Sequence, residues 1–111
     1  MDSKAWDEAE RFAQWFKDNS ALPPDAQKMA RVLKLSEECG EAAQAVIGVL
    51  AENPRKGGIT HTWDDVSKEL CDTIFTGMVA LATINPNAAA FFTAHVNFLR
   101  ERADEREATV N

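Results

Sequence analysis

The sequence predicts an all-α protein: a compact, four-helix bundle-like domain that forms an oligomer. Apolar residues recur at spacings of three and four through most of the chain, and no useful stretch alternates like a β-strand. Breaks rich in Pro, Gly or Asn divide the pattern into four segments. With 111 residues, 45% of them apolar, the chain fits one globular domain spanning residues 1–111.

The first two helices are predicted over residues 3–18 and from about residue 25 to 52. Trp6, Phe12 and Phe16 lie on the apolar stripe of the first helix, and Trp6 is expected in the core. Residues 19–24 contain two prolines and separate the helices, and Asp25 is a suitable N-cap for the second. The second helix is the longest predicted element.

The third and fourth helices follow a loop over residues 53–64, in which Thr62 or Asp64 is a possible N-cap. The third helix runs to about Ile84 and is apolar almost all round, which indicates burial against a second subunit. After an Asn-Pro-Asn break, the fourth helix covers residues 88–106. Because the first and third connections are short, helices one and two, and helices three and four, are expected to be antiparallel neighbours.

Charge and composition exclude several classes of function. The net charge of −6 leaves no basic stripe for a nucleic acid polymer, and the longest apolar run is too short for a bilayer. The N-terminus resembles neither a secretory nor a mitochondrial address, so we expect a cytoplasmic protein. Cys39 and Cys71 are too few for a disulfide framework and are expected to be free, buried thiols.

Five carboxylates occur in two clusters with helical spacing, Glu37-Glu38-x-x-Glu41 and Glu69-x-x-Asp72. Residues three apart lie about 60° from each other around a helix, so each cluster presents a pair of acids on one face, beside apolar neighbours. Converging carboxylates repel one another, and a divalent cation removes that repulsion. An all-oxygen set suits Mg²⁺, with Mn²⁺ as a substitute, whereas zinc is expected to recruit His or Cys.

A simpler interpretation treats the first cluster as ordinary surface acids that pair with Lys34 or Lys68. The second cluster favours the cation site, because Asp72 stands between apolar residues of the third helix. Burying an unpaired charge there costs on the order of several kcal/mol.

The segment KLSEECGEAAQAVIG, followed by DDVSKELCDTIFTGMVAL, resembles the MazG-like all-α nucleoside triphosphate pyrophosphohydrolases, whose signature is E-E-x-x-E, a spacer and E-x-x-D. The resemblance covers residues 28–84, with a long spacer of 27 residues between the two clusters. It implies four Mg²⁺ ligands: Glu38, Glu41, Glu69 and Asp72. It also implies that Glu37 assists Glu38 in catalysis, from the edge of the site, by orienting water.

The reaction implied by the resemblance converts a nucleoside triphosphate and water to a monophosphate and pyrophosphate, as part of nucleotide-pool house-cleaning. Cations would contact the phosphates and an aromatic ring would stack on the base. The family often supplies a Lys, Asn or Arg from the helix after E-x-x-D. The candidate contacts are therefore Lys34, Lys56, His61, Trp63, Asn97 and Arg100, although any one of the cations is also a plausible surface charge.

Other functions remain open. Phosphoribosyl-ATP pyrophosphatases have similar helices and acids, and a non-enzymatic dimerisation or binding module could use the acids to hold a structural ion. A di-iron bundle typically needs two Glu-x-x-His motifs, and the chain has none. The cysteines and histidines lack the spacing of a zinc site. An oligomeric hydrolase, as a homodimer or homotetramer, is the favoured prediction.

Overall fold

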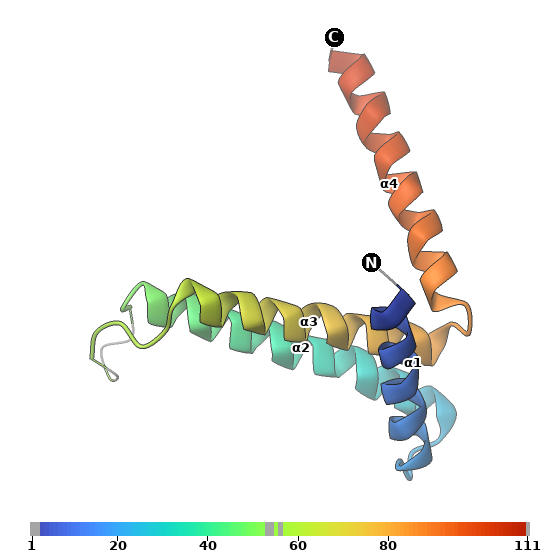
Figure 1. Cartoon of the computed structure of the whole chain (residues 1–111), viewed down its shortest axis with the longest axis horizontal. Helices are drawn as coiled ribbons and strands as arrows, with labels where there is room; N and C mark the ends of the chain where they lie inside the picture. Colours follow the sequence, from blue (N-terminus) through green and yellow to red (C-terminus); the bar gives the residue numbers. More distant parts are fainter. Residues whose placement is uncertain (1–2, 53–54, 56, 111) are drawn as a thin grey trace.

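The computed structural model describes residues 3–52, 55 and 57–110 and contains four helices. They are α1 (Ser3–Asp18), α2 (Pro24–Val49), α3 (Trp63–Ile84) and α4 (Ala88–Val110) (Figure 1). No strand occurs in the described residues, so the predicted all-α class is confirmed.

The predicted helix ends are close to those observed, with small differences. The N-cap of α2 is Pro23, which makes no side-chain cap bond, and Asp25 lies in the first turn. Thr62 caps α3 by accepting a hydrogen bond from the Asp65 backbone N–H, while the Asp65 carboxylate accepts one from the Thr62 N–H at 2.9 Å. These bonds hold the pKa of Asp65 below its ordinary value.

The helices pair differently from the prediction. α2 and α3 form a long antiparallel hairpin, α1 lies across the end of the hairpin away from the α2–α3 loop, and α4 leaves that end at an angle of 114° to α3 (Figure 1). Small residues permit close packing of the two helices: Ala45 is buried, and Gly77 lies against the Leu35 side chain of α2. α1 and α2 are therefore not the expected close pair, and neither are α3 and α4.

The single chain is also less compact than predicted. Its radius of gyration is 17.7 Å, against about 13 Å for a compact domain of this length. The core is a small cluster where α1, α3 and the first turns of α4 meet, and it includes Trp6, as predicted, together with Met78 and Val79. The Trp6 and Phe92 rings lie 5.8 Å apart, whereas most of α4 projects away from the other helices (Figure 1).

Cys39 and Cys71 are free, but both are exposed, so the predicted burial of the thiols is wrong. Both lie on parts of the hairpin surface that α1 and α4 leave open. In the described part of the chain, no single helix is long and apolar enough to cross a membrane, although α3 and α4 together would pass by length and composition if their 114° bend is ignored.

The α2–α3 loop is fastened to the end of α2. The Thr60 backbone N–H donates to the Gly48 carbonyl at 3.0 Å, and the His61 ring packs against the same glycine. The Thr60 hydroxyl and the His61 Nδ1 are 2.9 Å apart. The tether depends on the missing side chain of Gly48, since an added Cβ would overlap the His61 imidazole and lie 2.6 Å from the Thr60 Oγ1.

We therefore predict that Gly48→Ala lowers the free energy of unfolding by about 1–3 kcal/mol, the usual cost of overpacking. Gly40→Ala is the matched control in the same helix, because a Cβ at Gly40 meets nothing within 4 Å. It should stabilise the protein by up to about 1 kcal/mol through helix propensity. Urea unfolding followed by circular dichroism measures both changes, and equal effects at the two glycines would contradict the tether.

Candidate metal centre

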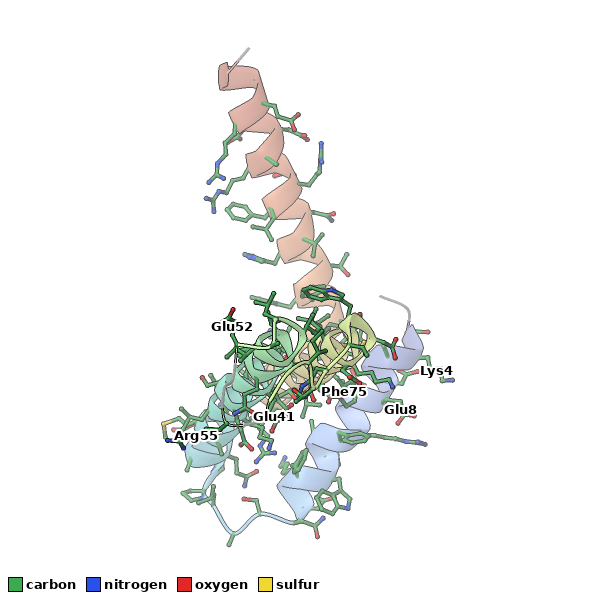
Figure 2. All side chains as sticks on the ribbon, turned by 90° about the vertical axis from the view of Figure 1, so that its left-hand side faces the viewer. Lys4, Glu8, Glu41, Glu52, Arg55 and Phe75 are labelled. Atoms are coloured by element: carbon green, nitrogen blue, oxygen red, sulfur yellow. The ribbon has the colours of Figure 1, made fainter. Side chains whose placement is uncertain are left out.

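The hairpin brings the two acidic clusters together. Glu38 and Glu41 project from α2 and Glu69 from α3, and one carboxylate oxygen from each lies within 4.8 Å of the others. The antiparallel pairing of α2 and α3 causes this, because it sets Glu69 of α3 opposite Glu38 and Glu41 of α2. Figure 2 labels Glu41, one of the three, in a view of the hairpin from its loop end.

The three carboxylates lie in different degrees of contact with solvent. The Glu38 side chain is 14% exposed, Glu69 is half-buried and Glu41 is exposed. The Oε2 atom of Glu69 is buried and has no hydrogen-bond partner, and it is the only such side-chain atom among the described residues. Asp72 is exposed, so the burial expected for it from its apolar neighbours is wrong. It does not belong to the converging three, but its charge still acts on Glu38.

The electrostatics of the cluster are unfavourable to its charged form. Burial raises the pKa of Glu38 above its ordinary value of 4.5, and the negative charges of Glu41 and then Asp72 add to the effect. A hydrogen bond with Glu41 also favours the protonated carboxyl, while Lys34 opposes the shift. The folded protein thus holds a carboxyl group that ionises less readily than in the unfolded chain.

This donor set fits a hard divalent cation. Several carboxylate oxygens converge, one of them is buried without a hydrogen-bond donor, and no His or Cys joins the group. Mg²⁺ and Mn²⁺ prefer such oxygen ligands and keep part of their shell for water or phosphate. A cation here would satisfy the Glu69 oxygen and remove the repulsion that raises the pKa of Glu38.

Among the ion pairs of the described residues, Lys34 is the cation that contacts the carboxylate cluster. Its Nζ lies 3.2 Å from Glu37 and 3.9 Å from Glu38, so part of the simpler surface-pairing interpretation is observed. Lys68, in contrast, pairs with Asp64 at 3.4 Å. Since Lys34 lies closer to the exposed Glu37 than to Glu38, it compensates little of the repulsion among the converging carboxylates.

An apolar cleft opens directly beside the acids, between α1, α2 and α3. Two charged residues already described, Glu38 and Lys34, line this cleft. The other lining residues are three aromatic side chains, one aliphatic, one hydroxyl and a second cation, namely Phe12, Phe16, Phe75, Val79, Thr76 and Arg31. The Arg31 guanidinium lies over the Phe16 ring, 4.1 Å from its centre.

Sequence reasoning missed this cleft because helical spacing alone assigns Phe12 and Phe16 to a core stripe. Phe12 is in fact 48% exposed and meets Phe75 edge-on, with 5.0 Å between ring centres. One signal was present: Arg31, Lys34 and Glu38 follow one another at steps of three and four, which aligns two cations with an acid on one face of α2.

The other predicted contacts lie elsewhere. His61 is held at the loop end of the hairpin, and Trp63 is the first residue of α3, not a loop residue, with 62% exposure. Asn97 and Arg100 lie on α4, which projects away from the hairpin, and Arg100 pairs with Asp104 at 2.6 Å. Lys56 lies outside the described residues. Of the five candidate contacts that the structure describes, a single chain therefore brings only Lys34 to the carboxylates.

Comparison with known proteins adds no relative to this picture. No family model, curated protein or solved structure matches the chain. The interpretation of the site therefore depends on its own geometry.

We predict that Glu38→Gln stabilises the metal-free protein at neutral pH. A group whose pKa is raised by folding makes the folded state less stable as the pH rises above the ordinary value of 4.5 and through the raised pKa. The neutral amide removes this loss, so the variant and the wild type should differ in stability at neutral pH and converge in acid. Thermal unfolding with a chelator present measures the difference.

With Mg²⁺ in place of the chelator, the order should reverse, because the wild type gains stability from the ion and the variant largely does not. Glu101→Gln, an exposed acid on α4, serves as the charge-matched control and should show neither effect. Equal stabilisation of wild type and Glu38→Gln by Mg²⁺ would exclude Glu38 as a ligand.

Proposed function

We propose that the protein is an Mg²⁺-dependent nucleoside triphosphate pyrophosphohydrolase, which converts a ribo- or deoxynucleoside triphosphate and water to a monophosphate and pyrophosphate. The observation that carries the proposal is the convergence of Glu38, Glu41 and Glu69 around a buried, unpartnered carboxylate oxygen. The resemblance of the two acidic motifs to MazG-like enzymes supports the same reaction. A role in cleansing the nucleotide pool follows from that resemblance.

In this proposal, Glu38, Glu41 and Glu69 hold the ion, and Asp72 completes the set from its exposed position on α3. Mg²⁺, when bound, supplies positive charge that offsets the charge on the phosphate oxygens and favours ionisation of water. Glu37 lies outside the converging three and accepts the proton of the attacking water. The water oxygen bonds to the α-phosphorus, the bond between that phosphorus and the α–β bridging oxygen breaks, and pyrophosphate leaves.

The cleft beside the acids supplies what the rest of the substrate needs. Lys34 and Arg31 lie about 6 and 10 Å from Glu38 along the helix axis, a span comparable to a triphosphate. Their charges would attract the phosphates to a chain whose net charge is −6. The Phe12, Phe16 and Phe75 rings offer an apolar surface on which a base can stack. Protein and substrate are both negatively charged, and the local cations together with the ion would make the electrostatic potential at the site favourable for the phosphates.

The activity is tested by incubating the protein and Mg²⁺ with a panel of ribo- and deoxynucleoside triphosphates and separating pyrophosphate from orthophosphate. We expect pyrophosphate and monophosphate in equal amounts. Glu41→Gln should lower kcat/KM by more than about 100-fold, since even residues that only support a metal ligand contribute 10- to 100-fold. Glu101→Gln controls for the loss of one surface charge.

Each outcome of the assay distinguishes among the functions. Orthophosphate as the first product would contradict attack at the α-phosphorus. Turnover of phosphoribosyl-ATP alone would favour the pyrophosphatase of that substrate. Stabilisation by Mg²⁺ with no turnover on any substrate would favour the non-enzymatic, metal-stabilised module.

Arg31→Gln should raise KM for the best triphosphate by about 10-fold while changing kcat less, because the lost charge acts on substrate binding. The matched control is Arg102→Gln. The Arg102 guanidinium also lies near a phenylalanine ring, 5.9 Å from the centre of Phe98, but on α4 and outside the cleft. Steady-state kinetics measure both variants, and a similar KM change in each would remove Arg31 from the substrate site.

A further inference from the structure

Lys34 lies between the carboxylates and the cleft. Its Nζ atom is 3.2 Å from an oxygen of Glu37 and 3.9 Å from an oxygen of Glu38, and its side chain also lines the cleft. The side chain is 43% exposed, so little packing restrains it. One flexible cation can therefore reach two places: the acids of the metal centre, and the cleft that would admit the phosphates.

The ion pair between Lys34 and Glu38 is of a weak kind. On a helix, an acid placed four residues before a lysine stabilises more than the reverse order, and here the lysine comes first. Helical side chains lean toward the N-terminus of their helix, which for Lys34 is the direction of Arg31 and away from both acids. The separation of 3.9 Å is also near the upper limit for an ion pair. Little stability is therefore lost when Lys34 leaves Glu38.

Two other cations of the hairpin are engaged elsewhere. The Arg31 guanidinium lies over the Phe16 ring, 4.1 Å from its centre. Lys68 pairs with Asp64, with 3.4 Å between the charged atoms. Among the ion pairs of the described residues, those of Lys34 are thus the ones in which a cation of the cleft also reaches an acid of the metal centre.

We infer that Lys34 is an internal counter-ion that competes with the divalent cation for the acids and, once displaced, turns into the cleft to bind the phosphates. A divalent ion carries twice the charge of an ammonium group and contacts several carboxylates at once, so the acids bind it more strongly. Lys34 is then repelled from Glu37 as well as from Glu38. Its departure leaves the Glu37 carboxylate free to accept a proton, and it gives the phosphates a cation that no acid offsets.

The inference rests on the metal centre of the proposed function but not on hydrolysis. Binding of the ion alone measures the competition, with no nucleotide and no turnover. Lys28 provides a matched control on the same helix: its side chain is also 43% exposed, and it pairs with Asp25 at 3.8 Å. It precedes Glu38 by ten residues, about 15 Å along the helix axis, so solvent and salt screen its charge from the acids.

The test is a titration with Mn²⁺, in which electron paramagnetic resonance measures the free ion. Lys34→Gln removes the competing charge and should lower the dissociation constant of Mn²⁺ by about 5-fold, the factor that corresponds to the stronger exposed ion pairs. Lys34→Arg keeps the charge and should bind Mn²⁺ as weakly as the wild type. Lys28→Gln should change the dissociation constant by less than about 2-fold. Both lysines are on the surface, so all three variants should keep the helical circular dichroism of the wild type.

Kinetics give a second readout, in which the two positions of Lys34 act in opposite directions. Lys34→Gln should lower the Mg²⁺ concentration that gives half the maximal rate, and it should raise KM for the triphosphate by about 10-fold. If no triphosphate is hydrolysed, the proposed reaction fails, and the Mn²⁺ titration still decides the role of Lys34. Equal Mn²⁺ affinity in the wild type and Lys34→Gln overturns the inference, and so does an equal gain in Lys28→Gln. A wild type and a Lys34→Gln variant that both fail to bind Mn²⁺ overturn it together with the metal centre.

Discussion

The structure depends on the antiparallel packing of α2 against α3. This contact sets acids of one helix opposite those of the other, and it leaves apolar residues such as Val32, Leu70 and Ile74 exposed on the hairpin. Ala45 and Gly77 permit the close approach, and the tether between Thr60, His61 and Gly48 fixes the loop that joins the helices. α1 adds to this frame by covering one end, where it forms the third wall of the cleft.

The same packing creates an electrostatic cost. Burial and the negative charge of the neighbouring Glu41 raise the pKa of Glu38, and the Oε2 atom of Glu69 is buried without a hydrogen-bond partner. A protein selected only for stability would replace such a group with neutral residues. The presence of these carboxylates in the middle of the α2–α3 hairpin is therefore an argument for a ligand that compensates their charge. No His or Cys belongs to the group, which argues for a hard cation.

Local features of the fold followed from the sequence, and features set by long-range contacts did not. The four helices, the Thr62 cap and the core position of Trp6 depend on local spacing, and so does the placement of Glu38 and Glu41 on one face of α2. Which helices pair depends on which large apolar surfaces pack together. The length of the connections was therefore a poor guide to the neighbouring helices. Phe12 and Phe16 were assigned to a core stripe from their spacing, whereas they line the cleft. Periodicity alone does not separate a core residue from one in the wall of a cleft.

The two sides of the hairpin meet different physical requirements, which are access for a charged ligand and burial of apolar surface. The acid-bearing side must stay open to admit a charged ligand, so it cannot supply the apolar burial that two long helices need. Exposed apolar residues of the hairpin that lie outside the site, such as Leu70 and Ile74, can supply it. Burial there by a second chain would add free energy to the helices that carry Glu38 and Glu69, and this would offset the repulsion between their carboxylates. A bundle that closed around the acids within one chain would gain stability but would shut out the ligand that the acids attract.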